Sequence, residues 1–389
     1  MIKRLINYIG GFFPTRLSRQ LRELYVAIAI GNLAVSAVMI FEPIYLYQLG
    51  YSILSIITFY FAVYILYFLF MPFGAAAALR YGYERMIFLS AIFLVGFYAS
   101  FIGVATSPIF IPLAAICYAL QKTFYWPSFY YGFSTYGHDE EEGREVGNWE
   151  VLEVIVSAVG PFLGGLLLLL SNFSTLFVVA SLLIIIAHIP LITTAEPTTP
   201  EPFSIAENYK RLLNPEKRRL VISFLGYGEE FVFLTMWPLF IYIAFMKNLF
   251  SLGSLIAVTT TLTVIIIFYI GRLTDRTNKR EVLRTSSILY ALVWVMRLFV
   301  SGIGGLVIVD TMSRLTKRML LVPQMSLVFE RARHRHHAMA TSMLFEMSLV
   351  VGKILAMIFL FLFFLLIPQI AWPMTFLLAA AFTFLYVLL

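Results

Sequence analysis

Four ionisable residues with helical spacing lie between long apolar runs of the chain. The stretch VDTMSRLTKRMLLVPQ (309–324) contains Asp310, Arg314, Lys317 and Arg318. A helix would place Asp310, Arg314 and Lys317 on one face, with Arg318 one turn beyond Arg314. Charges inside a membrane are costly and usually functional, so this stripe is a candidate site for binding an anionic solute or exchanging protons.

Carboxylates that could exchange protons with this stripe lie at a matching depth. At 1.5 Å per helical residue, Lys317 and Arg318 lie about 15 to 17 Å from the predicted cytoplasmic end of their helix, and Glu229 and Glu230 roughly 14 to 15 Å from theirs. A carboxylate in a low-dielectric environment titrates nearer neutrality, and a basic neighbour lowers its pKa again. We therefore expect Glu229 or Glu230 to alternate between protonation and pairing with Lys317 or Arg318. Further candidates, near the inner ends of their helices, are Glu150, Glu153 and Glu346.

A deeper layer of basic residues is accompanied by aromatic side chains. Lys122, Arg314 and Lys353 each lie about 21 Å deep by the same measure. Tyr118, Lys122 and Tyr125 share a broad helical face in CYALQKTFYWPSFYYGF. A cation within an aromatic wall suits an amphiphilic or aromatic anion, or a zwitterion. The alternative is that the charges form ion pairs that only fix helix packing, and that the rings face lipid or other helices.

The elements that must position these residues are membrane-spanning helices. Only 13% of the residues are charged, whereas soluble domains carry about 25%. Apolar stretches of roughly 20 residues, enough to cross a bilayer, recur along the whole chain. They predict an all-α integral membrane protein with twelve spans, at about 21–48, 52–79, 86–105, 108–136, 148–170, 174–194, 219–246, 251–271, 282–301, 304–328, 338–362 and 369–389.

Charges in the loops predict the orientation of these spans. Basic loops alternate with loops that lack Lys and Arg, apart from Lys247. By the positive-inside rule both termini and the basic loops are cytoplasmic, and residues 1–20 form an amphipathic leader on the membrane surface. The net charge of +7 thus reflects membrane topology, and we expect a multi-pass protein of the cell membrane with no nucleic-acid partner.

The sequence predicts two related halves joined by a polar linker. The stretch 193–219 is rich in Pro, Thr and charged residues, which is typical of a linker. We expect six-helix bundles at 21–194 and 219–389, with a cytoplasmic linker at 195–218. Matches at offsets of 195 or 196 residues support a duplication. They pair Pro43 with Pro238, Arg80 with Arg276, Pro127 with Pro323 and Glu150 with Glu346.

Two motifs resemble signatures of the major facilitator superfamily. GRLTDRTNKR (271–280) resembles the superfamily's loop signature, with Asn278 in place of a Gly, and the first-half copy has Leu79 in the Asp position. GNWEVLEVIVSAVGPFLGG (147–165) resembles the antiporter signature, with Val156 in place of the middle Gly. The alternative for this second motif is a helix-packing device, since small residues let helix backbones approach closely.

This resemblance implies two pseudo-symmetric six-helix bundles around a central cavity, lined by the first, fourth, seventh and tenth spans. The substrate-binding candidates are then Lys122, Tyr118, Tyr125, Arg314, Lys317 and Asp310. The proton-coupling candidates are Glu229, Glu230, Arg318 and Glu346.

Other kinds of chemistry find little support in the sequence. Cys117 is the only cysteine, which excludes disulfides within the chain and paired thiolate sites. RARHRHH (331–337) contains His334, His336 and His337, but a basic cytoplasmic loop explains them better than a metal site. No enzyme motif or phosphate-binding loop is present, so we expect neither enzymatic activity, nor a cofactor, nor a bound metal.

The pattern predicts a secondary active transporter that works by alternating access and is coupled to protons. The cargo would be a small amphiphilic or anionic organic solute, and the antiporter-like motif favours export. We expect a monomer in the lipid bilayer. The alternatives are a lipid or lysolipid transporter and a non-transporting receptor or scaffold with the same fold.

Opposite loop charges predict a gate on the cytoplasmic side. The loop HDEEEGRE (138–145) is the only strongly acidic inner loop, with Asp139, Glu140, Glu141 and Glu142. In the superfamily the loop 271–280 approaches the inner end of the fifth span when the transporter opens outward. Asp275 would then lie near the positive N-terminal end of that helix, while the acidic loop would meet Arg276, Lys279 and Arg280.

We predict that this acid–base contact favours the outward-open state. Each exposed pair contributes some tenths of a kcal/mol, so several together shift the populations roughly tenfold. Changing Arg276, Lys279 and Arg280 together to Glu should raise labelling of a cavity cysteine from the cytoplasmic side, more at low salt than at high salt. Unchanged labelling at both salt concentrations would contradict the latch.

Overall fold

The computed structural model describes residues 19–136, 142–189, 202–270, 279–333 and 338–388, and this part of the chain is helical, with no strand. The first half contains α2 (Arg19–Met39), α3 (Glu42–Gln48), α4 (Ile53–Tyr81), α5 (Tyr83–Val104), α6 (Phe110–Tyr136), α7 (Glu142–Leu170) and α8 (Phe173–His188). A short helix, α9 (Ile205–Leu212), follows within the predicted linker. The second half contains α10 (Arg218–Leu225), α11 (Gly228–Phe231), α12 (Trp237–Ala244), α13 (Leu249–Ile270), α14 (Lys279–Met296), α15 (Gly302–Arg333), α16 (Ala338–Leu366) and α17 (Ala371–Phe384).

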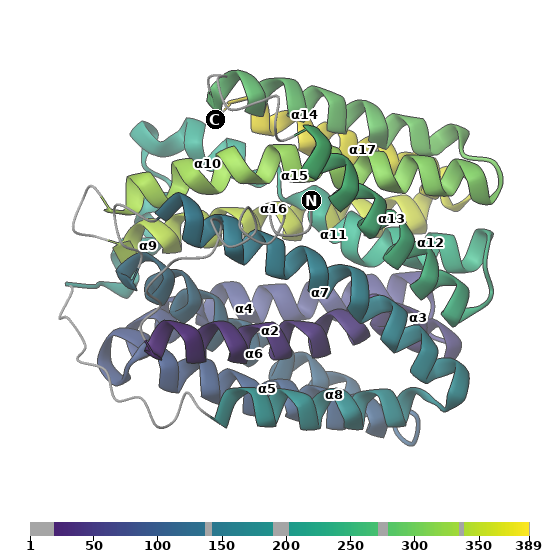
Figure 1. The fold of residues 1–389 in the computed structure, drawn as a ribbon, viewed down its shortest axis with the longest axis horizontal. Coiled ribbons are helices and arrows are strands. Elements are labelled where there is room, and N and C mark those ends of the chain that lie inside the picture. The colour runs from purple at the N-terminus through teal and green to yellow at the C-terminus, as the bar shows by residue number, and fades with distance from the viewer. Residues whose placement is uncertain (1–18, 137–141, 190–201, 271–278, 334–337, 389) are drawn as a thin grey trace, which may run out of the picture.

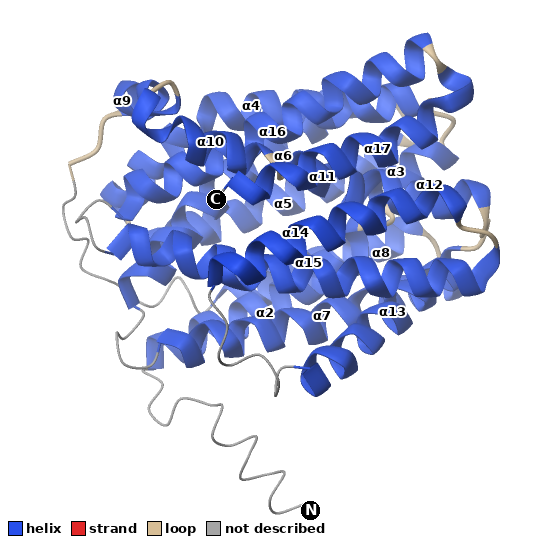
Figure 2. Ribbon diagram, turned by 90° about the horizontal axis from the view of Figure 1, so that it is seen from above, coloured by secondary structure: helices blue, strands red, loops and turns tan. Residues whose placement is uncertain are grey.

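The long helices run side by side in two groups. In Figure 1, α2 to α8 occupy the lower part of the molecule, and α10 to α17, coloured from teal through green to yellow, occupy the upper part. The view in Figure 2, turned by 90°, shows the same lengthwise alignment, with α9 at one end. The most extensive contacts between the groups are those of α7 with α13 and of α16 with both α4 and α6. The bundle boundaries inferred from the sequence stay a prediction.

Eight helical segments of the described chain are long and apolar enough to cross a membrane. Two further apolar helices, Ile155–Leu170 and Phe173–His188, are shorter. The charge-bearing helix α15 is 32 residues long. An all-helical membrane fold is therefore present, while the count of twelve spans stays a prediction.

The first and seventh predicted spans are interrupted rather than continuous. In the first, α2 ends at Met39 and α3 begins at Glu42, with Pro43 in its first turn. In the seventh, a π-helical turn (Val232–Met236) precedes α12, whose first turn contains Pro238. Proline lacks a backbone N–H and clashes with the preceding turn, which accounts for the break before Pro43 and for the π-helical turn before Pro238. These two prolines were paired by the sequence repeat. The seventh span also has a turn at Gly226 and Tyr227, between α10 and α11.

Glycines of α7 bring this helix close to one helix of each group. A Cβ on Gly160 would lie 2.6 Å from Oγ of Ser36, and one on Gly164 would collide with the backbone carbonyl of Ala37, both on α2. A Cβ on Gly165 would lie 3.1 Å from the carbonyl oxygen of Leu249 on α13. The motif that resembles the antiporter signature therefore serves close packing of α7 against both α2 and α13.

We predict that Gly164→Ala destabilises the protein, because the added methyl group has no room against the α2 backbone. Overpacking of this kind costs about 1–3 kcal/mol, which should lower the thermal unfolding midpoint of purified protein in detergent. Gly304→Ala is the matched control, since a Cβ at Gly304 meets no atom within 4 Å. Equal midpoints for the two variants would contradict the packing argument.

Candidate functional site

Two glutamates of α11 pair with lysines from two other helices. Nζ of Lys317 on α15 lies 3.2 Å from Oε1 of Glu229 and 3.7 Å from Oε1 of Glu230. Nζ of Lys353 on α16 lies 2.6 Å from Oε2 of Glu230. The expected pairing of Glu229 or Glu230 with Lys317 is therefore present, and Lys353 completes a network of two acids and two bases.

The two glutamates differ in their access to solvent. The side chain of Glu230 is 22% exposed, whereas that of Glu229 is 1% exposed. Glu229 also accepts a 2.7 Å hydrogen bond from the hydroxyl of Tyr290 on α14. Glu230 is thus the more exposed of the two carboxylates, and Glu229 is held in the protein interior.

Lys122 lies among aromatic rings. Its ammonium group lies 4.2 Å from the ring centre of Tyr118 and 5.5 Å from that of Tyr64. Lys353 lies 5.3 Å from the ring centre of the same Tyr64, so lysines of both halves approach one aromatic side chain. Among the residues that the structure describes, no carboxylate lies within salt-bridge distance of Lys122. Lys122 is thus contacted by aromatic faces rather than by a direct ion pair.

Asp310 is the centre of a second polar cluster. Its carboxylate is fully buried and accepts hydrogen bonds from Nε1 of Trp237 at 2.9 Å, Oγ1 of Thr259 at 2.5 Å and Nε of Arg314 at 2.7 Å. Three donors occupy this carboxylate, while the Arg314 side chain stays 16% exposed. Asp310 therefore orients the side chain of Arg314. Of the two residues, Arg314 is the one that a solute can contact.

Arg297 belongs to this cluster and was missed by the sequence analysis. It is 2% exposed and donates a 2.7 Å hydrogen bond to Ser313. Its guanidinium carbon lies 3.6 Å from the ring centre of Trp294 and 4.0 Å from that of Trp237, distances typical of cation–π contacts. A lone arginine in the apolar run VWVMRLFV was the available signal.

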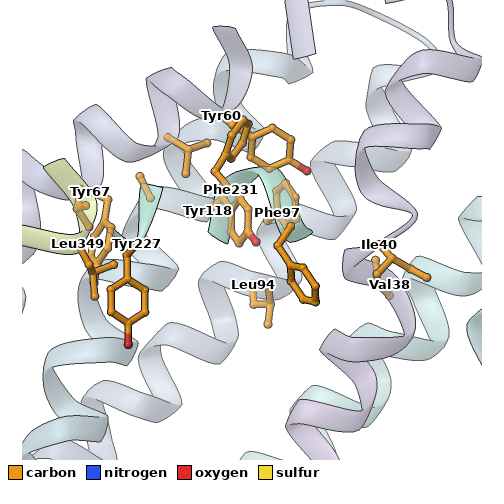
Figure 3. Packing of buried hydrophobic residues seen from close by; sticks show 14 of the residues in the cluster. Val38, Ile40, Tyr60, Tyr67, Leu94, Phe97, Tyr118, Tyr227, Phe231 and Leu349 are labelled. Carbon is orange, nitrogen blue, oxygen red and sulfur yellow. The ribbon is translucent and has the colours of Figure 1, made fainter. Parts of the chain in front are cut away.

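Glu42 was also missed, although it stands beside Pro43 in the repeated motif. It is 1% exposed and accepts a 3.3 Å hydrogen bond from the hydroxyl of Tyr60. The ring of Tyr60 packs against Phe231 of α11, with 5.6 Å between the ring centres, and Figure 3 shows these two rings close together. The first half thus places a buried carboxylate near the helix that carries Glu229 and Glu230.

Glu346 on α16 contacts the opposite group of helices. Its Oε1 accepts a 2.7 Å hydrogen bond from the hydroxyl of Tyr67 on α4. Both residues are buried, and Oε2 of Glu346 has no hydrogen-bond partner among the described residues. In Figure 3, Tyr67 lies beside Leu349 of α16. A carboxyl group predicted for proton coupling therefore lies at the contact between the two groups.

Of the remaining predicted residues, the structure describes three, whereas the side chains of the others are not described. Tyr118 stacks on Phe97 with 4.3 Å between the ring centres, Tyr125 stacks on Phe129 at 5.8 Å, and Arg318 is half-buried on α15. The gating prediction cannot be placed in the structure. Asp139, Glu140, Glu141, Asp275 and Arg276 lie outside the described residues, and the side chains of Glu142, Glu150, Glu153, Lys279 and Arg280 are not described either.

No cluster of three His, Cys, Asp or Glu side chains that could hold a metal ion occurs in the described part of the chain. His334, His336 and His337 lie outside that part.

Comparison with known proteins agrees with this architecture. The model of the Major Facilitator Superfamily matches residues 24–227, slightly more than half of the chain. No curated protein sequence gives a significant match.

Solved structures share the fold at low sequence identity. A POT family transporter, PepTSo, aligns with a TM-score of 0.72 at 10% identity, covering 96% of this chain and 97% of its own. An autoinhibited POT family peptide transporter aligns with a TM-score of 0.69 at 12% identity, covering 94% and 95%. The E. coli fucose:proton symporter FucP gives 0.65 at 13% identity, covering 94% and 96%.

Proposed function

The chain belongs to the Major Facilitator Superfamily, and we propose that it is a secondary active transporter that couples protons to the movement of a small anionic or amphiphilic organic solute. It is a multi-pass membrane transport protein rather than an enzyme. The observation that carries the proposal is the buried network of Glu229, Glu230, Lys317 and Lys353.

Proton coupling is supported by the chemistry of this network. A protonated Glu230 would lose its charge and with it most of the attraction to Lys353, which now lies 2.6 Å away. Because these groups come from α11, α15 and α16, breaking one pair changes how three helices hold together. A buried base left without its acid is costly, so the protonation state of Glu230 would bias the arrangement of these helices.

An anionic group on the solute is supported by the position of Lys122. The ammonium group is bordered by tyrosine rings, and Arg314 is oriented by Asp310 while staying partly accessible. Rings beside a cation favour a solute with an apolar or aromatic body. We further propose that the protein functions as a monomer and exports its solute, the direction resting on the α7 motif that resembles the antiporter signature.

We predict that Glu230→Gln abolishes proton-driven transport without preventing folding, because Gln cannot gain or lose a proton and pairs less strongly with Lys353. The measurement is gradient-driven movement of a panel of radiolabelled organic anions in proteoliposomes, where we expect at least a tenfold loss, about 1.4 kcal/mol. Glu216→Gln, an exposed site, is the matched control and should retain wild-type rates. Wild-type rates for both Glu229→Gln and Glu230→Gln would overturn the coupling assignment.

We predict that Lys122→Gln weakens binding of the best anionic solute from that panel by roughly tenfold to a hundredfold, because the solute loses its charge-assisted partner. Binding is measured by equilibrium titration of purified protein. Lys247→Gln changes an exposed lysine and should leave the affinity unchanged. If no anion of the panel binds, or if the affinity for the best one is unchanged in Lys122→Gln, the anion assignment is wrong.

A further inference from the structure

The helix α4 has a backbone acceptor that its own helix cannot satisfy. Pro72 lies inside α4, and proline has no N–H to donate to the carbonyl four residues earlier. That carbonyl belongs to Phe68. A carbonyl without a donor inside a membrane protein is costly, so another group must satisfy it.

Tyr209 of α9 supplies this donor. Its hydroxyl lies 3.2 Å from the carbonyl oxygen of Phe68 and 2.9 Å from that of Leu69, so one proton is shared between two acceptors. The ring of Tyr209 also packs edge-on against the ring of Phe68, with 5.6 Å between the centres. Ser204 caps the start of α9 by accepting a hydrogen bond from the backbone N–H of Glu207. The linker therefore contributes a helix docked on α4.

The same short helix contacts the second group of helices. α9 packs against α16 as well as against α4, and Asn208 on its inner side is 3% exposed. The carbonyls held by Tyr209 directly follow Tyr67, whose hydroxyl bonds to Glu346 of α16. The contact of α9 with α4 and the hydrogen bond between the two groups thus lie on adjacent residues of α4.

We propose that α9 is a clasp on the α4–α16 contact: Tyr209 holds the two groups of helices together at the predicted cytoplasmic side, and opening of that side requires Tyr209 to leave the α4 carbonyls. The clasp lies in the linker between the two halves, so it acts on the rate and extent of opening without contacting the solute. It depends neither on the identity of the solute nor on proton coupling.

The test measures how far the predicted cytoplasmic side opens, as a distance between the two halves. Arg85 and Arg284 are exposed sites near the starts of α5 and α14. Spin labels attached to Arg85→Cys and Arg284→Cys, in a Cys117→Ser background, report the distance between the halves by pulsed electron paramagnetic resonance. Tyr209→Phe keeps the ring and removes the hydroxyl. We expect the ratio of long to short distances to rise roughly fivefold, the effect of losing one hydrogen bond.

Two further variants make the outcome specific. Tyr81→Phe removes an exposed hydroxyl at the end of α4 and should leave the distances between the spin labels unchanged. Pro72→Ala restores an N–H that can satisfy Phe68 from within α4, so Tyr209→Phe should have a smaller effect in that background. Identical distance distributions for Tyr209→Phe and the wild type, or an equal shift for Tyr81→Phe, would overturn the clasp.

Discussion

Buried ionised groups must be paired, and this constraint organises the second half of the molecule. An isolated carboxylate or ammonium group in a low-dielectric interior is costly, and removing one partner from a buried pair is strongly destabilising. The short helix α11 presents Glu229 and Glu230 to lysines of α15 and α16, so those three elements keep a fixed relation as long as the charges persist. A change in protonation therefore acts on helix packing directly.

Breaks in the helices accompany these charges in both halves. Glu42 lies in the first turn of α3, and Glu229 and Glu230 lie in the first turn of α11. The break before Pro43 and the turn at Gly226 and Tyr227 directly precede the short helices that carry these carboxylates.

The sequence predicted the parts of this arrangement that depend on local pattern and depth. Helical spacing and depth along the helices were enough to predict that Glu229 or Glu230 would meet Lys317 or Arg318, because both quantities follow from the rise per residue. They could not reveal that the carboxylate of Asp310 is occupied by Trp237 and Thr259, since those contacts depend on which helices are neighbours. The contacts of Tyr67 and Tyr209 were missed for the same reason.

The aromatic ring of Phe233 lies between the two polar clusters. This residue lies in the π-helical turn of the seventh predicted span, and its ring centre lies 4.5 Å from Nζ of Lys317 and 5.3 Å from Cζ of Arg314. One ring thus faces Lys317 of the carboxylate–lysine network and Arg314 of the Asp310 cluster. π-Helical turns are often found at functional sites. A shift of this turn would move Phe233 relative to both cations together, so that rearrangement of the carboxylate–lysine network alters the surroundings of the accessible arginine.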